Sequence, residues 1–517
     1  MRSGGRLNRI LPIAAIVLAA TSCWTAFSLF THITLEDALI TFRYARHVAS
    51  GQGFVFNPGE HVLGTTTPLL TLALGLAGAI AGADSIPLIA NVLMILAAAG
   101  AGVMTCRALE ALGCARGLAL FSAAALMLHP DLLWMVTGGM ETPLVLLFMA
   151  TGLWALAVGR YSAAAAAAAL LALTRIDGLA WSAGILACIA WQERAAVRRS
   201  LLIFTAIVLP WVIFAFAWFG SPIPHSLIAK RVIGGGYNIF NLSPLLEHLS
   251  WNGPYFAWSF PFAAPLGYAA FAIGAWAIFR KPSPPALRLV VLFPFVLSAA
   301  FYVGRAPWFG WYMAPAGYAS VIVGAIGVWH VARLLTDSAI FRRLPRRAFP
   351  AAAAVFFGGY FALTGARGME VAANERVRQI NEDGLRRNVG LWLRDNTPRD
   401  AVVAMEAVGY QAYYSDRRVI DFAGLVSPAV VAIRRASPSN AEAFDRVLRD
   451  LKPDYLVLRS FEVDQNMHYH GGRLFESPEH WAYFWDHYDE EDRFEAPLPA
   501  VWGRTAYLTI FRRLPGP

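Results

Sequence analysis

The first residues whose types and spacing could do chemistry are two adjacent acids, Glu36 and Asp37, which follow a long apolar run near the start of the chain. Two neighbouring carboxylates can raise the pKa of one of them toward the range of a general base, which takes a proton from an attacking hydroxyl. A structural interpretation is also open: after Thr34 the acids would lie in the first turn of an amphipathic helix, where they favour its dipole.

Cationic residues that could hold a phosphate lie in three other polar stretches. Arg175 and Asp177 belong to LTRIDG, Lys230 and Arg231 follow the turn SPIPHSL, and Arg305 belongs to GRAPWFGWYMAP. Arg binds phosphate bidentately, and Lys binds it as a point charge. The alternatives are a structural ion pair for Arg175 and contact with lipid headgroups for the pair at 230–231.

Further side chains near these stretches suit contacts with a sugar or a cation. They are the aromatic residues Trp308, Trp311 and Tyr312, the potential ligands His129, Asp131 and Glu141, and His225. Aromatic faces complement sugar rings, but Trp and Tyr also gather at membrane interfaces for no catalytic reason. The potential ligands leave a divalent cation open as a cofactor. His225 resembles a polar loop residue more than a base.

The composition places these residues in a membrane protein. Of the 517 residues, 57% are hydrophobic and only 15% are charged, whereas a soluble domain has about 25% charged residues. A soluble enzyme is therefore excluded. All 43 basic residues except Lys230, Lys281 and Lys452 are arginines, many of them clustered between apolar runs, which indicates topology rather than nucleic-acid binding. The four cysteines lie in or beside apolar runs and provide no disulfide framework.

Eleven apolar runs are predicted to cross the bilayer. They are 10–30, 86–106, 117–129, 141–158, 161–174, 178–192, 200–219, 260–279, 286–303, 312–334 and 348–366. With this count the basic clusters at 107–116, 160, 194–199, 280–281 and 342–347 fall on the cytoplasmic side, together with the N-terminus, and the pair at 230–231 lies outside. The count requires the run 68–83 to lie along the outer interface or to re-enter without crossing. The alternative is that 68–83 spans and a short Ala-rich run such as 161–174 does not.

The C-terminal residues have a different pattern. From about Arg367 charged residues return at ordinary frequency, and a charged amphipathic helix precedes the strand-like AVVAMEAVG, VIDFAGL and PDYLVLR. We therefore predict a transmembrane domain over 1–366, with a first external loop over 31–85, and an extracytoplasmic α/β domain over 367–517. In that domain Tyr410, Tyr413, Tyr414 and Asp421 could contact a glycan, although such residues more often form the surface and core of a domain.

Several motifs together resemble the GT-C superfamily of polyprenyl-phosphate-sugar-dependent glycosyltransferases. EDALITFRYARHVASGQGFVFNPGE followed by GTTTPLL is similar to their first external loop, most of all in the mycobacterial-type terminal arabinofuranosyltransferases and related bacterial enzymes. GMETPL, LTRIDG, SPIPHSLIAK and VGYQAYYSDRRVIDFAGLVSP extend the resemblance over most of the chain. It implies a polytopic α-helical membrane protein of GT-C-like fold, with about 11 transmembrane helices, an amphipathic first external loop and a C-terminal soluble α/β domain.

The resemblance also implies roles for residues. In such enzymes an acid of the first external loop is the general base, and the matching residues here are Asp37 and Glu36. The superfamily's acid is often the first of the pair and an Asp, whereas the first of the pair here is Glu36. We carry both residues and prefer Asp37. The expected donor-phosphate ligands are Arg175, Lys230, Arg231 and Arg305. The expected substrate contacts are Arg43, Tyr44, Glu141, Asp177, His225, Trp311 and Tyr312.

The expected function is that of a bacterial inner-membrane glycosyltransferase with a cytoplasmic N-terminus and an extracytoplasmic C-terminal domain. It would move a sugar, arabinofuranose by the family resemblance, from a polyprenyl-phosphate carrier to a cell-envelope glycan or lipid. Membrane lipid is a further expected partner, and nucleic acid is not. A transporter or flippase of lipid-linked glycans is the alternative, but the sequence lacks the mid-span charges and inverted repeats of that class. A third interpretation is a non-catalytic assembly protein that works through its C-terminal domain.

Overall fold

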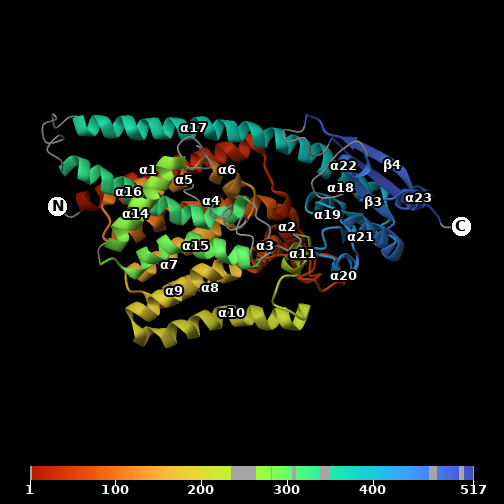
Figure 1. Cartoon of the computed structure of the whole chain (residues 1–517), viewed down its shortest axis with the longest axis horizontal. Helices are drawn as coiled ribbons and strands as arrows, with labels where there is room; N and C mark the ends of the chain where they lie inside the picture. The colour runs from red at the N-terminus through yellow and green to blue at the C-terminus, as the bar shows by residue number, and fades with distance from the viewer. Residues whose placement is uncertain are drawn as a thin grey trace. The chain divides into compact units, whose positions relative to one another are not determined.

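The computed structural model describes residues 3–233, 264–280, 282–304, 310–337, 348–464, 474–499 and 506–515 (Figure 1). Contacts divide the chain into two units. Unit 1 comprises Met1–Phe30, Asn91–Pro210 and Tyr237–Ala373, and unit 2 comprises Thr31–Ala90, Trp211–Gly236 and Asn374–Pro517. The expected division at residue 366 follows membrane topology and stays a prediction. By contacts, the expected external loop groups with the C-terminal residues.

Long apolar helices make up unit 1. The helices that contribute to it are α1 (Ser3–Thr31), α4 (Ile86–Ala111), α5 (Arg116–Met127), α6 (Pro130–Thr137), α7 (Thr142–Ala157), α8 (Tyr161–Thr174), α9 (Gly178–Gln192), α10 (Val197–Phe219), α14 (Ala264–Arg280), α15 (Pro285–Gly304), α16 (Met313–Asp337) and α17 (Ala348–Glu382). Each of the eleven predicted apolar runs coincides with one of these helices. The prediction of helices there is therefore confirmed.

How many of these helices cross a bilayer stays a prediction. Within the described residues, five helices are long and apolar enough to do so, or six if α5 and α6, which meet at a bend of 60°, form one broken span. The helices α7, α8 and α9 are shorter, at 16, 14 and 15 residues. At about 1.5 Å per residue such helices are shorter than a hydrocarbon core of about 30 Å.

Small residues allow the helices of unit 1 to pack closely. A Cβ on Gly274 of α14 would lie 2.0 Å from the carbonyl oxygen of Val323, and one on Gly327 of α16 would lie 1.9 Å from that of Ala270. Only glycine fits at such a crossing of two backbones. Close backbone approach through small residues is how membrane helices associate when lipid removes the hydrophobic drive.

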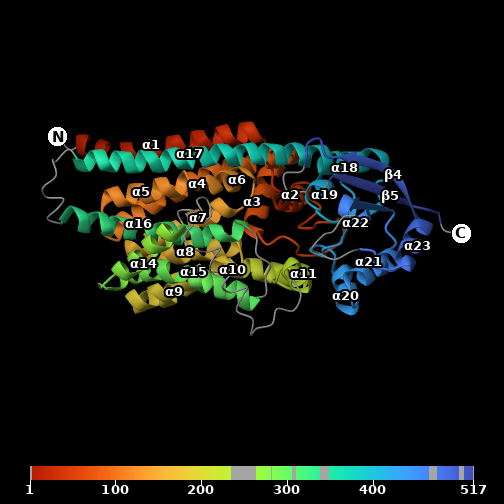
Figure 2. The same ribbon diagram turned by 45° about the horizontal axis from the view of Figure 1, so that its top comes forward.

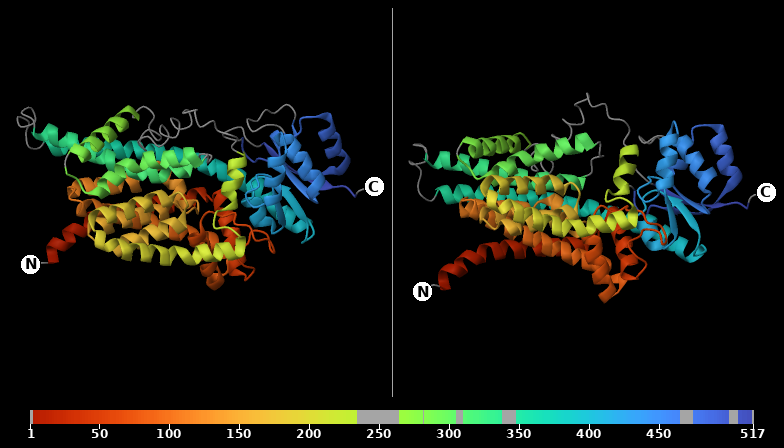
Figure 3. Two further views of the ribbon diagram at one scale, coloured as in Figure 1. Left: turned by 60° about the horizontal axis from the view of Figure 1, so that its bottom comes forward. Right: turned by 90° about the horizontal axis from the view of Figure 1, so that it is seen from below.

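A five-stranded mixed sheet forms the centre of the C-terminal part of unit 2 (Figure 3). Its strands are β1 (Val402–Met405), β2 (Arg418–Asp421), β3 (Tyr455–Arg459), β4 (Tyr488–Glu495) and β5 (Tyr507–Arg513), in the order β2-β1-β3-β5-β4. β1 is parallel to β2 and β3, whereas β5 is antiparallel to β3 and β4. The three strand-like segments of the sequence are the parallel strands, so that prediction is confirmed.

Unit 2 also contains short helices. They are α2 (Glu36–Ala49), α3 (Pro68–Ala81), α11 (His225–Ile233), α18 (Asn388–Asn396), α19 (Tyr410–Ser415), α20 (Pro428–Ala436), α21 (Asn440–Arg446), α22 (Ser460–Val463) and α23 (Pro478–His487). α19 packs against α2 (Figures 1 and 2). α3 is the run 68–83, and it packs on α2, where Gly75 lies against Val48. Whether α3 crosses the membrane stays a prediction.

Candidate active site

The acidic pair opens α2, in its first turn, as the sequence predicts. The residue that precedes the helix is Leu35, which has no side-chain acceptor to cap it. Thr34 instead donates its backbone N–H to Gln379 Oε1 at 3.0 Å. The acids therefore compensate part of the positive helix end by their own charge.

Glu36 is bound by groups from the C-terminal part of unit 2. Its Oε1 accepts the backbone N–H of Gly409, and its Oε2 accepts that of Tyr410 at 3.3 Å and lies 3.5 Å from Arg386 Nη1. Burial raises the pKa of Glu36 to about 7; nearby Glu382 adds to the rise, and Arg386 and the two N–H groups oppose it. These contacts favour a positioning role, because both carboxylate oxygens already have partners.

Asp37, the second acid, is subject to two positive charges. Burial raises the pKa of Asp37 above its ordinary value, and the positive charges of Lys230 in α11 and Arg378 in α17 oppose that rise. Its side chain is partly exposed. A partly exposed carboxylate with a raised pKa, acted on by two positive charges, has the properties of a general base next to a phosphate site.

The structure thus brings together two residues that the sequence analysis assigned separately, Asp37 and Lys230. Arg231, the next residue, is exposed. Arg378 is a third member that sequence reasoning missed; its side chain is 44% exposed and lies 3.3 Å from Glu375. The signal available was the charged stretch NERVRQINEDGLRR, which we predicted only as an amphipathic helix.

Three buried threonine hydroxyls adjoin this turn of α2. Thr41 lies one helical turn after Asp37, and its Oγ1 is 3.4 Å from that of Thr65 and 3.2 Å from that of Thr67. The two loop hydroxyls are 3.1 Å apart. These contacts therefore hold the loop segment GTTTP (64–68) against α2, the helix that carries Asp37.

Arg43 and Tyr44, expected as substrate contacts, are fully engaged within unit 2. Arg43 is 2% exposed, and its guanidinium donates to the carbonyl oxygens of Phe56, Ala412 and Arg417. The Tyr44 hydroxyl donates to Val62 O at 2.6 Å and accepts the N–H of Gly64 at 2.8 Å. These contacts favour a structural role, in which the two side chains hold loops against α2.

His225 stands at the start of α11, on the same short helix as Lys230. Its backbone N–H donates to Leu63 O at 2.7 Å, which fixes the helix start to the loop after α2. Burial lowers the pKa of His225, and the positive charge of Arg435 acts in the same direction. The backbone hydrogen bond to Leu63 favours a structural role for His225 over that of a base.

Arg175 lies in unit 1, in a buried ion-pair network. Its Nε donates to Asp177 Oδ1 at 2.8 Å, its Nη2 donates to Asp177 Oδ2, and Glu141 Oε1 lies 3.7 Å from Nε. The guanidinium is 2% exposed and also donates to Trp311 O at 3.2 Å, with the ring of Tyr312 5.0 Å from its Cζ. Two carboxylates neutralise this one cation, so the structural interpretation of LTRIDG is favoured over phosphate binding.

The other predicted positions of unit 1 divide into two groups. Trp311 and Tyr312 adjoin Arg175 as described, whereas Arg305 and Trp308 lie outside the described residues. Among the residues that the structure describes, no three His, Cys, Asp or Glu side chains are grouped to hold a metal ion. The three potential ligands have other neighbours: His129 Nδ1 accepts the N–H of Asp131 at 3.2 Å, and Glu141 lies against Arg175.

The polar residues singled out in the C-terminal part of the chain have contacts within unit 2. Asp421, at the end of β2, is 1% exposed and accepts the N–H groups of Ala423, Leu425 and Val426, so it shapes the loop that follows. Tyr410 donates its hydroxyl to Thr34 O at 2.8 Å. The ring of Tyr413 lies 3.7 Å from Arg46 Cζ, and that of Tyr414 lies 5.2 Å from Arg387 Cζ.

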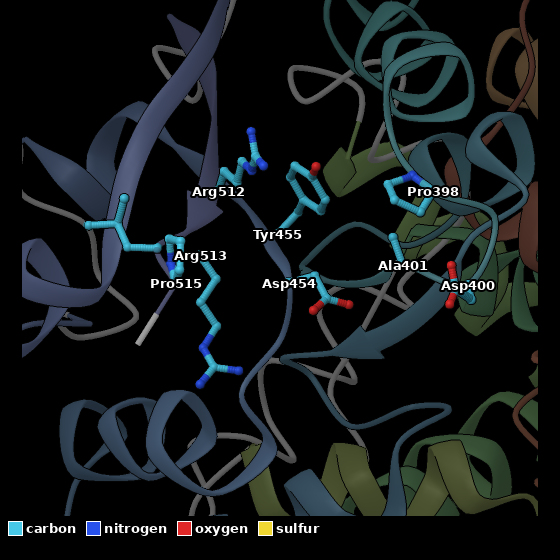
Figure 4. A pocket seen from close by; sticks show the side chains of 9 residues that line it. Pro398, Asp400, Ala401, Asp454, Tyr455, Arg512, Arg513 and Pro515 are labelled. Carbon is cyan, nitrogen blue, oxygen red and sulfur yellow. The ribbon is translucent and has the colours of Figure 1, made fainter. Parts of the chain in front are cut away.

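A cavity of about 470 Å³ lies where β1 and β3 begin (Figure 4). It is lined by Pro398, Asp400, Ala401, Asp454, Tyr455, Arg512, Arg513, Leu514 and Pro515. Asp454 is partly used, since its Oδ2 accepts the N–H of Val402 at 2.8 Å. None of its lining residues belongs to the group around Asp37.

The family described as "Domain of unknown function (DUF8728)" matches residues 375–508. The terminal beta-(1->2)-arabinofuranosyltransferase of Mycobacterium tuberculosis is 24% identical over 312 residues, which are 52% of this chain and 48% of that protein. The match thus spans about half the length of the curated relative.

Two solved structures share the fold. ArnT from Cupriavidus metallidurans bound to undecaprenyl phosphate superposes with a TM-score of 0.55 at 15% identity, over 98% of this chain and 99% of that one. The oligosaccharyltransferase of Archaeoglobus fulgidus gives a TM-score of 0.56 at 13% identity, over 86% of this chain and 69% of that one. The chain therefore has the fold of the GT-C glycosyltransferases, and its sequence resembles that of a mycobacterial arabinofuranosyltransferase.

Proposed function

We propose that this protein is an inner-membrane glycosyltransferase that moves a sugar from a polyprenyl-phosphate carrier to a hydroxyl of a cell-envelope glycan or lipid. The observation that carries the proposal is that the positive charges of Lys230 and Arg378 both act on the partly exposed Asp37 in unit 2. It supplies a base and cations at one place, which is what transfer from a sugar phosphate needs. The GT-C fold supports the same reaction class.

In the proposed reaction Asp37 removes the proton of the acceptor hydroxyl as that oxygen attacks the anomeric carbon. The bond from this carbon to the phosphate oxygen breaks, and its electron pair leaves with the polyprenyl phosphate. Lys230 and Arg378 stabilise the negative charge that develops on the phosphate. The proton ends on the Asp37 carboxylate, so atoms and charges balance without a metal or a further co-reactant.

The finer features of the proposal rest on the relatives. The name of the curated relative supports arabinofuranose as the sugar. The undecaprenyl phosphate bound to ArnT supports a polyprenyl carrier. The positive-inside pattern of the arginines supports transfer on the outer face of the membrane, with the C-terminal residues on that side.

The experiment that tests this function is sugar transfer by the purified full chain in nanodiscs. Synthetic polyprenyl-phosphate arabinofuranose and other polyprenyl-phosphate sugars serve as donors, with a panel of arabinan and glycolipid acceptors. We expect donor-dependent formation of a glycosidic bond by the wild type and a rate at least about 100-fold lower for Asp37→Asn. Absence of turnover with every donor, or transfer at the wild-type rate by a folded Asp37→Asn protein, would overturn the proposal.

A further inference from the structure

Aromatic side chains form a row along α23 and the segment that precedes it, outside the group around Asp37. Phe475 stacks on Trp481 with ring centroids 4.2 Å apart at 25°, and Trp481 and Trp485 are nearly parallel at 6.3 Å and 15°. Phe475 is buried and Trp481 is partly buried, whereas Trp485 is 50% exposed. The row therefore runs from the core of the domain to its surface.

The two tryptophans stand one helical turn apart, which places them on the same face of α23. The inner part of this helix packs through Phe484, which is fully buried and lies 5.0 Å from the ring of Phe511 in β5. Trp481 also packs against this core, and the ring of Trp485 lies 5.9 Å from that of Phe511. Half of Trp485 remains in solvent although burial would stabilise so large an apolar side chain.

The polar residues of α23 decide which ligand suits this surface. The helix PEHWAYFWDH carries the exposed acids Glu479 and Asp486 and no Lys or Arg. Helices that lie on a membrane surface are typically rich in Lys and Arg, because the headgroups attract cations. Acids beside aromatic faces suit a neutral sugar chain, whose C–H faces stack on the rings and whose hydroxyls donate to carboxylates.

We propose that Trp481 and Trp485 form a glycan-binding platform that holds the acceptor polymer away from the transfer site. α23 and α2 lie at opposite ends of unit 2 (Figures 1 and 2). A second site of this kind raises the effective concentration of a long acceptor near the catalytic residues. The proposal rests on the proposed function only for the identity of the polymer as the acceptor.

The test measures binding without turnover. Full-length Asp37→Asn protein in detergent is run in native gels that contain soluble linear arabinan or dextran, alone and with Trp485→Ala, Trp481→Ala or Trp485→Phe. We expect arabinan to retard the parent, the alanine variants to bind about tenfold more weakly, and Trp485→Phe to recover most of the binding. Trp191→Ala, which removes a 78% exposed tryptophan of α9, is the control and should match the parent.

The outcomes separate this proposal from the proposed function. Equal retardation of the parent and of folded Trp485→Ala and Trp481→Ala, or no retardation of the parent by either polymer, overturns the platform. The platform is also overturned if the alanine variants lose binding to vesicles of anionic lipid but keep binding to arabinan. Platform-dependent binding together with a wild type that transfers no sugar would support the platform and reject the proposed function.

Discussion

Arg386 Nη1 lies 3.5 Å from Oε2 of Glu36, whose two carboxylate oxygens also accept the backbone N–H groups of Gly409 and Tyr410. Glu36 thereby joins the first turn of α2 to the start of α19. Because Asp37 is the next residue, fixing Glu36 also fixes the backbone from which Asp37 projects. We infer that the adjacent acids have different roles: Glu36 positions the turn, and Asp37 takes part in the reaction.

The first prediction concerns stability against pH. Burial raises the pKa of Glu36 from an ordinary 4.5 to about 7. Between these values the folded protein retains a proton that the unfolded chain has released, so the free energy of unfolding falls as pH rises through this window, by roughly 3 kcal/mol at most. Glu36→Gln cannot ionise and should flatten the fall. Thermal unfolding in detergent between pH 4.5 and 8 measures it, and an unchanged slope in the variant would contradict the prediction.

The second prediction separates the two acids in catalysis. Asp37→Asn keeps the size of the side chain but cannot accept a proton, so we expect kcat to fall by about 10²- to 10⁴-fold. Stability should hold or rise slightly, because a partly buried carboxylate is replaced by a neutral amide. Glu36→Gln should reduce turnover less than Asp37→Asn does. Sugar transfer in nanodiscs gives both rates; if the two folded variants lost equal turnover, the division of roles would be wrong.

The third prediction uses the charge of Lys230. That charge lowers the pKa of Asp37, so Lys230→Ala should raise it. A base acts in its ionised form, and the acid limb of the profile of kcat/KM against pH should therefore move to higher pH. The KM for the donor should also rise because the phosphate loses a cation.

Two comparison variants make the result interpretable. Lys230→Arg keeps the charge and should hold the acid limb in place. Arg231→Ala removes the exposed neighbouring cation and should shift the limb less than Lys230→Ala does. A limb that moved to lower pH in Lys230→Ala would contradict the pairing with Asp37.

Local sequence patterns were sufficient to predict the apolar helices, the three parallel strands and the acids at the start of α2. Hydropathy and the spacing of apolar residues are properties of one short segment, so each such element can be recognised from that segment alone. The partners of those acids could not be predicted in this way. Arg378 and Arg386 come from a segment more than 300 residues away in the sequence, and only tertiary packing brings them to α2.

The same limit explains the expectation for Arg43. The RYA segment belongs to a motif of the proposed family, which made its Arg and Tyr candidates for substrate contacts. The groups that engage Arg43 are backbone carbonyls of Phe56, Ala412 and Arg417. Any residue type supplies such a carbonyl, so no sequence pattern marks these partners.

The fourth prediction tests whether Arg175 has a structural role. Removing Asp177 leaves a buried guanidinium with Glu141 as its remaining carboxylate, 3.7 Å away. Breaking a buried ion pair costs about 3–5 kcal/mol, so Asp177→Ala should strongly lower the unfolding temperature. Donor KM should change little in the protein that stays folded. If Arg175→Lys raised donor KM and left stability intact, the phosphate-binding interpretation would regain support.

The last prediction concerns the contact that joins α19 to α2. A Cβ on Gly409 would lie 2.0 Å from the carbonyl oxygen of Glu36, well inside van der Waals contact. The φ angle of Gly409 is −69°, so any residue could adopt its backbone conformation, and the reason for glycine is space alone. Gly409→Ala should therefore push α19 from α2 and reduce both stability and transfer. Gly365→Ala, in α17, meets nothing within 4 Å and should be neutral or stabilising by about 1 kcal/mol. Equal unfolding temperatures for the two variants would show that α19 does not need this close contact, and Glu36 would then lose its positioning role.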